Sequence, residues 1–228
     1  MPVNSLNFDD ILEKIEKDLK SPGNITTIYT PNAEIVMVGY FNSYFQSVMQ
    51  QFDLGLPDGS SLIWAGNMLG QPLQKRITGG EAMEKLILYA AKRKAGIGLI
   101  GGRGSVAELA LECLKRKYPG LRGWSDSGPV FVTNENFDDR LAVSLVNQQS
   151  PSSKAQRHSQ SEVTQNFIGD SHIKPHIPYT KYDIRNTFSP SIQQEIKRLA
   201  RKIVDTKTRF VFVALGCPKQ EYFIQELK

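Results

Sequence analysis

An aspartate within a Pro-Asp-Gly turn, Asp58, is the carboxylate of this sequence that is best placed for acid–base chemistry. It follows a short apolar stretch at residues 53–56 that we predict to be a strand, and no charged residue adjoins it. Such a carboxylate suits a general base that takes a proton from a hydroxyl nucleophile, if burial raises its pKa toward the working pH. The alternative is a turn aspartate that accepts hydrogen bonds from its own backbone, which is common in Pro-Asp-Gly turns.

A second polar cluster, Gly216-Cys-Pro-Lys-Gln-Glu221, follows the apolar run at residues 210–215. The β-branched and aromatic residues of that run predict a buried strand, and the glycine–proline turn ends it. Ligands of open α/β sheets bind beyond the carboxyl ends of the strands, because helices cover both faces of the sheet. Since Gln220 cannot titrate, we expect it to bind a ligand by hydrogen bonds rather than to transfer protons.

Two glycine-containing turns have the composition of phosphate sites. Arg76-Ile-Thr-Gly-Gly80 precedes a predicted helix, where backbone N–H groups and an arginine favour an anion. Gly101-Gly102-Arg-Gly-Ser105 joins a predicted strand to a helix, but it lacks the complete G-x-G-x-x-G pattern, and a tight turn without a ligand is the alternative. We identify no acidic residue at a strand end about 20 residues later that would bind a ribose, which disfavours a dinucleotide oxidoreductase.

The sequence predicts no metal site and no cofactor. His172 and His176 have a metal-like spacing, but they lie in an irregular region, and no third ligand stands near them. Cys113 and Cys217 provide neither a disulfide framework nor the spacing of metal ligands, so we expect reduced thiols and a cytoplasmic protein.

Composition and charge describe an ordinary globular protein with a preference for anions. Hydrophobic residues make up 40% and charged residues 22% of the chain, and the net charge of +5 favours an anionic partner. A basic helix face formed by Lys197, Arg198, Arg201 and Lys202 is either solvated or in contact with lipid. Neither a secretory signal nor a membrane-spanning stretch is predicted.

Alternating strands and helices must position these turns. Helices are predicted to contain residues 8–19, 35–49, 60–69, 83–90, 106–114 and 190–203, and strands are predicted at 25–29, 53–56, 97–100 and 210–215. This order predicts an α/β, Rossmann-like fold, with a mostly parallel sheet and helices on both faces. In a parallel sheet the turns after the four strands lie at one edge, so we expect them to converge.

The chain is interpreted as one domain over residues 1–228. Its regular order ends near Asn147, and residues 148–188 are rich in Ser, Gln, Lys and Pro. A structureless loop of this length is unusual inside a compact domain, so we interpret 148–188 as an insertion or a disordered loop.

Six motifs in order resemble the WecG/TagA/CpsF family of bacterial glycosyltransferases. They are Thr-x-Asn at 30–32, Leu-Pro-Asp-Gly at 56–59, Arg-x-Thr-Gly at 76–79, Leu-Ile-Gly-Gly at 99–102, Lys-Tyr-Pro-Gly-Leu at 117–121 and Gly-x-Pro-Lys-Gln-Glu at 216–221. The resemblance therefore extends from about residue 25 to residue 221.

The resemblance implies a Rossmann-like enzyme that transfers a sugar from a UDP-sugar to a polyprenyl-diphosphate-linked acceptor, in cell-surface polysaccharide or teichoic-acid-type biosynthesis. The best-known members use UDP-N-acetylmannosamine and undecaprenyl-diphosphate-N-acetylglucosamine, and they invert the anomeric centre without a metal. It implies that Asp58 is the general base. Sugar contacts are implied for Thr30, Asn32, Arg76 and Gln220, and nucleotide contacts for Gly101, Gly102, Gly216 and Pro218.

The chain departs from the family pattern at two places. Residues 148–188 have no counterpart that we recognise, and the chain stops at Lys228, in the helix that follows Gln220. We therefore expect either a C-terminally incomplete piece or a partner chain that supplies the remainder. A non-catalytic nucleotide-sugar-binding or scaffold protein is the alternative function. Peripheral contact with the inner face of the plasma membrane and a homo-oligomer are left open, and no nucleic acid is expected as a partner.

Overall fold

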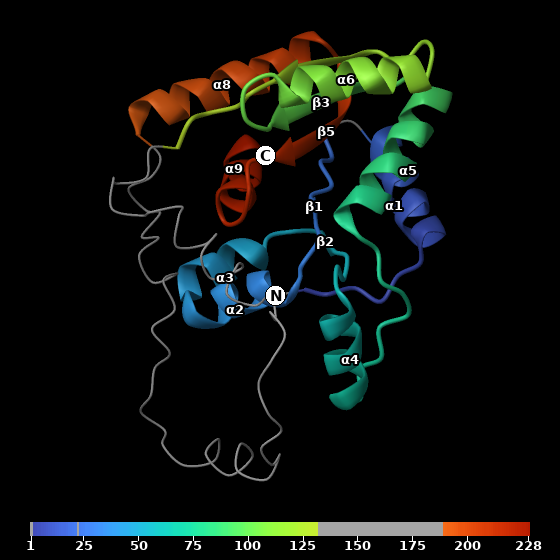
Figure 1. Cartoon of the computed structure of the whole chain (residues 1–228), viewed down its shortest axis with the longest axis vertical. Helices are drawn as coiled ribbons and strands as arrows, with labels where there is room; N and C mark the ends of the chain where they lie inside the picture. Colours follow the sequence, from blue (N-terminus) through green and yellow to red (C-terminus); the bar gives the residue numbers. More distant parts are fainter. Residues whose placement is uncertain (1, 22, 132–188) are drawn as a thin grey trace, which may run out of the picture. The chain divides into compact units, whose positions relative to one another are not determined.

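The computed structural model describes residues 2–21, 23–131 and 189–228, and these form an α/β arrangement (Figure 1). The helices are α1 (Phe8–Lys20), α2 (Ala33–Phe41), α3 (Ser43–Met49), α4 (Ser60–Met68), α5 (Gly79–Lys92), α6 (Val106–Lys117), α8 (Pro190–Asp205) and α9 (Lys219–Leu227). The strands are β1 (Ile28–Tyr29), β2 (Leu54–Gly55), β3 (Gly96–Gly101), β4 (Gly123–Asp126) and β5 (Thr208–Ala214).

All strand pairs in the described residues are parallel, as predicted, but the strands form two sheets rather than one. One sheet has the order β4-β3-β5, and the other consists of β1 and β2, with two residues each. The Asp53 side chain ties the short pair together, because its Oδ2 accepts hydrogen bonds from the Thr27 amide at 2.8 Å and the Thr27 hydroxyl at 2.7 Å. The parallel arrangement places the strand ends that carry the predicted turns at the same edge of each sheet.

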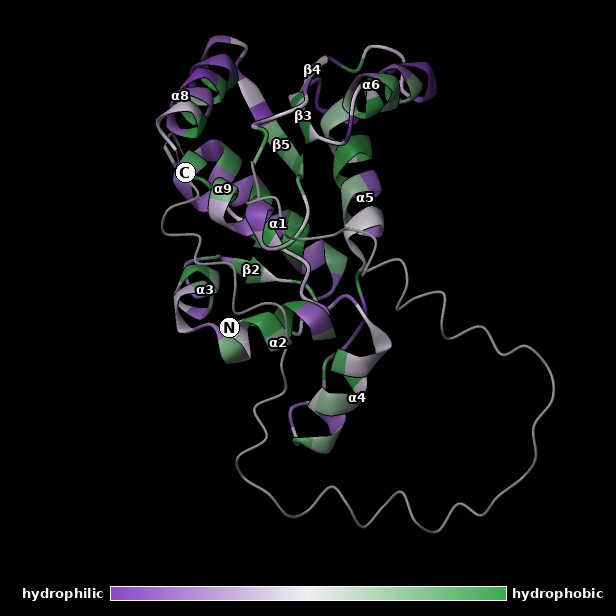
Figure 2. Cartoon of the chain, turned by 60° about the vertical axis from the view of Figure 1, so that its left-hand side comes forward, coloured by the Kyte–Doolittle hydropathy of each residue, from purple (hydrophilic) through white to green (hydrophobic). Residues whose placement is uncertain are grey.

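Helices cover both faces of the larger sheet, which confirms the Rossmann-like α/β prediction (Figure 2). Ile97 and Leu99 of β3 join a buried cluster with residues of α1, α5 and α6, and Leu54 of β2 belongs to the same cluster. Ile100 faces the other way and packs with Leu199 of α8 and with α9. The alternation follows from the period of two residues in a strand. The shared cluster holds the two sheets against a common helical layer.

Strand β4 was missed in the sequence analysis, and its stability depends on distant residues. A β-carbon on Gly98 of β3 would lie 2.6 Å from the Trp124 ring, so the missing side chain makes room for the indole. The Trp124 Nε1–H group donates to the hydroxyls of Thr206 at 3.0 Å and Thr208 at 2.7 Å. These contacts join β4 to the turn between α8 and β5.

The predicted helix through residues 35–49 is two helices. Asn42 ends α2 and caps α3: its backbone is extended, with φ −126° and ψ 99°, and its Oδ1 accepts a hydrogen bond from the Phe45 amide at 2.9 Å. An asparagine gains more from capping than from a helix interior, so it interrupts an apolar pattern that is otherwise continuous. The predicted start of α8 is confirmed, with Ser189 as the cap and Pro190 in the first turn.

The segment 148–188, predicted to be an insertion or a disordered loop, lies outside the described residues, as do His172 and His176. The single-domain boundary and the incomplete C-terminus remain predictions.

Replacing Leu199 with alanine tests the packing of α8 on the sheet. Leu199 is fully buried between α8, β3 and α9, so Leu199→Ala should lower the free energy of unfolding by about 2–5 kcal/mol in urea titrations. The control is Val204→Ala on the same helix, where the side chain is 73% exposed. Equal stability losses in the two variants would contradict this packing.

Candidate functional site

The Asp58 carboxylate lies at the N-terminus of α5. Its Oδ2 accepts a hydrogen bond from the Gly79 amide at 3.2 Å, and its Oδ1 lies 3.7 Å from a guanidinium nitrogen of Arg76. A helix N-terminus and a guanidinium both attract anionic groups. The partners of the carboxylate therefore come from the first residue of α5 and the segment before it, and not from the Pro-Asp-Gly turn that the alternative interpretation invoked. The side chain remains 30% exposed, which leaves it accessible to a ligand.

Thr30 lies beside the same helix terminus. A β-carbon placed on Gly79 would lie 3.1 Å from Thr30 Oγ1, so the end of β1 and the start of α5 are in close contact. The Asp58 backbone N–H also donates to the Pro31 carbonyl at 2.8 Å, which fixes the turn after β2 against the turn after β1. The structure thus brings Thr30, Asp58 and Arg76 together.

Asn32 is next to this cluster, and the oxygen of its side-chain amide already has a hydrogen-bond partner. It is the N-cap of α2, and its Oδ1 accepts a hydrogen bond from the Ile35 amide at 2.9 Å. The cap fixes the orientation of the side chain, with the Nδ2 group at the opposite end of the amide. The sugar contact predicted for Asn32 would therefore use Nδ2 as a donor.

Gln220 lies in the first turn of α9, beyond the end of β5. Its Nε2 donates to Glu221 Oε1 at 2.9 Å, and Glu221 is almost completely buried, with 1% of its surface exposed. The second carboxylate oxygen of Glu221 is buried without a hydrogen-bond partner in the described structure. Burial raises the pKa of this carboxyl group above its usual value, although the hydrogen bond from Gln220 opposes the change.

The turn after β5 lies within the electrostatic influence of Glu34 in α2. Burial, together with the negative charges of Glu221 and Glu34, raises the pKa of the Cys217 thiol. Glu34 is in the first turn of α2, two positions after Asn32, so the turn after β5 lies close to the turn after β1. The side chains of Asp58 and Gln220 share no hydrogen bond in the described part of the chain. The Asp58 cluster follows the sheet of β1 and β2, whereas Gln220 follows β5 of the other sheet.

Gly101 and Gly102 are in close contact with the end of β5. Gly101 has φ of 115°, and a β-carbon there would lie 2.3 Å from the Ala214 carbonyl oxygen of β5. The Gly102 N–H group donates to the same oxygen at 3.1 Å, so this amide already has a partner. Gly216, with φ of 81°, and Pro218, which precedes α9, form the following turn. The nucleotide contacts predicted for these four residues remain a proposal.

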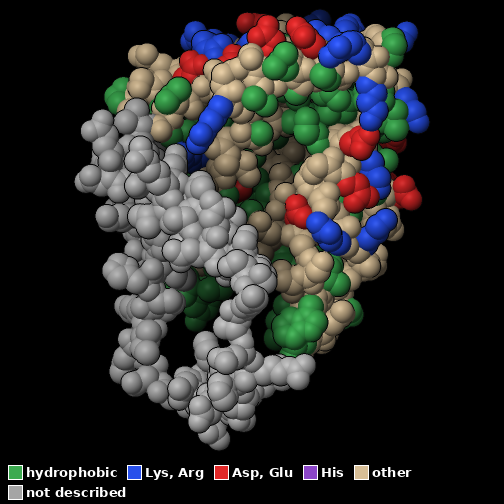
Figure 3. Space-filling model, in the orientation of Figure 1, with side chains coloured by type: hydrophobic (Ala, Val, Ile, Leu, Met, Phe, Trp, Pro, Cys, Tyr) green, Lys and Arg blue, Asp and Glu red, His purple; other side chains and the backbone are tan. Residues whose placement is uncertain are grey.

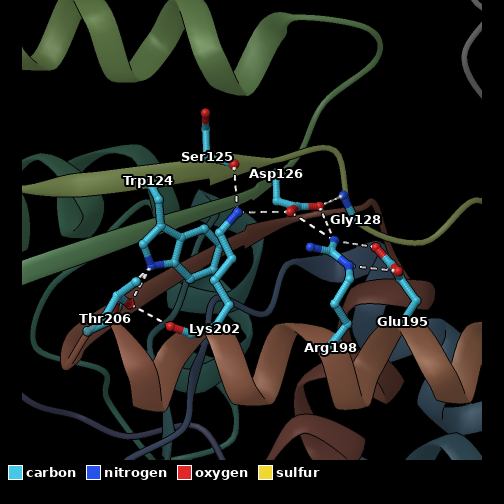
Figure 4. A network of polar contacts seen from close by, with 9 residues as sticks. Trp124, Ser125, Asp126, Gly128, Glu195, Arg198, Lys202 and Thr206 are labelled. Atoms are coloured by element: carbon cyan, nitrogen blue, oxygen red, sulfur yellow. Dashed lines mark hydrogen bonds and ion pairs between the residues drawn. The ribbon is translucent and has the colours of Figure 1, made fainter.

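An acidic residue does end the strand about 20 residues after the glycine-rich turn, contrary to our expectation. Asp126 closes β4, and both of its oxygens accept hydrogen bonds from Arg198 at 2.9 Å (Figure 4). Lys202 and the Gly128 amide donate to it as well, at 3.1 Å each. Burial alone would raise the pKa of Asp126, but hydrogen bonds from Arg198, Gly128 and Lys202 lower it below its usual value. This carboxylate is thus engaged in holding β4 to α8.

The same contacts involve two of the four residues in the basic face of α8. Arg198 bonds to Glu195 and Asp126, and Lys202 bonds to Asp126 and lies 4.5 Å from the centre of the Trp124 ring. Half of the predicted basic face is therefore neutralised by acidic side chains. Arg198 and Lys202 join α8 to the end of β4.

No group of three or more potential metal ligands occurs among residues 2–21, 23–131 and 189–228. Within these same ranges, no helix combines the length and apolar character that crossing a membrane requires.

Glu221→Gln should stabilise the protein increasingly as the pH rises. Burial raises the pKa of Glu221 in the folded protein. The folded protein therefore holds the Glu221 proton more tightly than the unfolded chain, in which a glutamate has a pKa of about 4.3. The free energy of unfolding of the wild type therefore falls as the pH rises from the unfolded pKa to the folded pKa of Glu221. A glutamine carries no charge at any of these pH values, so the variant does not lose this stability. Thermal melts from pH 4 to pH 8 should show a difference from the wild type that grows with pH.

The control for this prediction is Glu226→Gln, an exposed glutamate on the same helix. A difference between Glu221→Gln and the wild type that stays constant across the pH range would show that burial does not shift this group.

The amino-acid sequence matches a known protein family. The profile of the glycosyl transferase WecG/TagA/CpsF family matches residues 1–153 and 171–228. A protein of Bacillus spizizenii, named N-acetylglucosaminyldiphosphoundecaprenol N-acetyl-beta-D-mannosaminyltransferase, is 29% identical over 151 residues, which are 63% of this chain and 58% of the relative. Proteins of the same name are 29% identical over 125 residues in Bacillus subtilis and 27% identical over 116 residues in Staphylococcus aureus.

These matches span 54% and 51% of this chain, and 48% and 46% of the Bacillus subtilis and Staphylococcus aureus proteins. The chain thus spans about half the length of the curated relatives that it matches. Because the family profile covers most of the sequence, this protein belongs to the glycosyl transferase WecG/TagA/CpsF family.

Proposed function

We propose that this protein is a glycosyltransferase that moves N-acetylmannosamine from a UDP-sugar to N-acetylglucosamine on a polyprenyl diphosphate, in cell-surface polysaccharide or teichoic-acid-type assembly. The names of the relatives support both the transferred sugar and the lipid-diphosphate acceptor. The observation that carries the proposal is the convergence of Thr30, Asp58 and Arg76 at the N-terminus of α5, in a chain of this family.

The reaction uses Asp58 as a general base. The carboxylate takes the proton from an acceptor hydroxyl as the hydroxyl oxygen attacks the anomeric carbon of the donor. The bond between that carbon and the diphosphate oxygen breaks, and its electron pair leaves with UDP. Attack from the face opposite the leaving group inverts the anomeric centre. The proton on Asp58 then passes to water, and the carboxylate is ready for another cycle.

Arg76 supplies the positive charge that the leaving group requires. Its guanidinium is about half exposed and lies near Asp58 Oδ1, at a distance longer than a direct hydrogen bond. A bound diphosphate would compete for this guanidinium and draw it away from the carboxylate. Such an exchange would free Asp58 for the acceptor hydroxyl and stabilise the charge that develops on the diphosphate.

Neutral groups are proposed to bind the donor sugar. The Thr30 hydroxyl and the Asn32 and Gln220 amides provide donors and acceptors without adding charge near the reacting centre. Gln220 Nε2 is held by the buried Glu221 carboxyl, so its Oε1 is left to accept a hydrogen bond from a sugar hydroxyl or amide. No metal or cofactor enters this mechanism. We propose that the reaction takes place at the inner face of the plasma membrane, where a polyprenyl-linked acceptor is available.

Asp58→Asn should lower kcat by about 10²- to 10⁴-fold and leave donor affinity nearly unchanged, because an amide cannot accept the hydroxyl proton. The assay follows radiolabelled N-acetylmannosamine from its UDP donor to a polyprenyl-diphosphate-N-acetylglucosamine. The control is Asp205→Asn, which removes an exposed carboxylate at the end of α8. Wild-type turnover by Asp58→Asn would exclude this residue as the base.

UDP should stabilise the protein against thermal unfolding, whereas NAD should not. A ligand at about 100 times its dissociation constant adds about 2.7 kcal/mol to the free energy of unfolding. Calorimetry with UDP and with UDP-N-acetylmannosamine gives the affinities directly, and Gln220→Ala should weaken the sugar nucleotide more than UDP. UDP binding without turnover would favour the alternative, a non-catalytic nucleotide-sugar-binding protein. Stabilisation by NAD alone would contradict the proposed donor.

A further inference from the structure

Helix α4 contributes no buried residue to the protein, although its sequence is largely apolar. Trp64 in the middle of the helix, Met68 at its end and the C-cap Leu69 have 65%, 68% and 78% of their surfaces exposed. Figure 2 colours most of α4 as apolar or neutral, and Figure 3 shows hydrophobic side chains gathered over it. Single exposed apolar residues are common on proteins, but a cluster of large ones on one helix marks an interaction site.

Among the described residues, the loop that follows α4 lies against the helix. A β-carbon on Gly66 would lie 2.8 Å from the Gln71 carbonyl oxygen and 3.1 Å from the Leu73 side chain, so the following loop folds back against the helix. The Gln71 amide also donates to the Gly66 carbonyl at 2.9 Å. This hairpin fixes α4 without burying Trp64, Met68 or Leu69. In the described part of the chain these three side chains stay open to a partner.

The distribution of charge indicates the chemistry of that partner. Residues 60–74 contain no Asp, Glu, Lys or Arg, and Lys75 and Arg76, both exposed, follow directly. Uncharged apolar side chains next to basic ones match the boundary between lipid acyl chains and anionic headgroups. A tryptophan suits the same boundary, because its ring is apolar while its indole N–H seeks a polar neighbour.

Helix α4 adjoins the candidate site in the chain. Gly59 is the N-cap of α4 and follows Asp58 directly, and Arg76 closes the loop that returns from α4 to the site. Contact of α4 with a bilayer would therefore bring the Asp58 cluster next to the membrane. An acceptor with a polyprenyl chain is held in a bilayer by that chain, while its sugar lies at the aqueous surface.

We propose that α4 docks this protein on an anionic phospholipid membrane, with Trp64, Met68 and Leu69 inserted among the lipids and Lys75 facing the headgroups. Membrane contact itself follows from the exposed side chains and their charge pattern. Its role, the presentation of a lipid-linked acceptor to Asp58, rests on the proposed function. The basic face of α8 is a weaker candidate, because Glu195 and Asp126 neutralise Arg198 and Lys202.

Co-sedimentation with vesicles tests the proposal without requiring turnover. The probe is a vesicle of 30 mol% phosphatidylglycerol in phosphatidylcholine, with pure phosphatidylcholine for comparison. The wild-type chain should bind the anionic vesicles, and the triple variant Trp64→Gln, Met68→Gln, Leu69→Gln should bind at least about tenfold more weakly. Binding to pure phosphatidylcholine should also be weaker than binding to the anionic vesicles.

The matched control removes three exposed apolar side chains from other helices: Val106→Gln, Leu109→Gln and Val204→Gln. It should bind vesicles like the wild type. Absence of wild-type binding, an unaffected α4 variant or an equal loss in the control would each overturn the proposal. So would a wild-type dimer that ignores vesicles and dissociates in the α4 variant, because a second copy would then cover this surface.

Tryptophan fluorescence supplies a second measurement that does not depend on the triple variant. The chain has two tryptophans, so Trp124→Phe leaves Trp64 as the only indole. Anionic vesicles should shift its emission to shorter wavelength, and brominated lipids should quench it. Emission that stays at the wavelength of a solvated indole while the protein sediments with vesicles would show that another surface binds, and would overturn the assignment to α4.

A turnover assay tests the proposed function independently of membrane docking. Vesicle binding that depends on α4, combined with a failure to transfer sugar, would leave the docking surface intact and reject the reaction. Transfer to a short, water-soluble acceptor that is normal in the α4 variant, combined with lost vesicle binding, would support both.

Discussion

The contact between the Asp58 carboxylate and the N-terminus of α5 is the interaction on which the candidate site depends. It joins the turn after β2 to the start of α5, and Arg76 and Thr30 lie at the same place. A carboxylate, a guanidinium, a hydroxyl and a helix N-terminus within one cluster provide a proton acceptor together with positive charge for an anion. This combination suits a transfer reaction in which a hydroxyl attacks and a diphosphate leaves.

Several groups near the site have structural partners, and this restricts the contacts that they can make with a substrate. The Asn32 oxygen caps α2, and the Gly102 amide is bonded to Ala214, so neither is free in the geometry described here. The Gln220 amide nitrogen is likewise bonded to a buried carboxyl group. The partners orient these residues before any ligand binds, which reduces the entropy that binding must overcome. A donor sugar would meet an arrangement that is already largely fixed.

Sequence reasoning was most successful where glycine and proline mark the ends of strands. The turns after β2 and β5 were located in this way, and Ser189 with Pro190 marked the start of α8. It failed for β4, which contains one large apolar residue and depends on the space above Gly98. The break at Asn42 was missed because the apolar pattern continues on both sides of it. In each failure the deciding contact was either distant in sequence or specific to one side chain.

The same limit applies to the candidate site. The positions of Asp58, Arg76 and Gln220 were visible as polar residues in turns, but the link between Asp58 and Gly79 and the complete burial of Glu221 were not. A glutamate is normally expected at the surface, so no sequence pattern signals its burial beside Gln220. Asp126 was overlooked for a related reason, because the strand that carries it was not recognised.

A crystal structure of this protein with an unreactive analogue of UDP-N-acetylmannosamine tests the account most directly. We predict that the sugar lies between Asp58 and Gln220, with the diphosphate near Arg76 and with space beside the carboxylate for an acceptor hydroxyl. An analogue bound away from the strand ends, for example along the basic face of α8, would contradict the account.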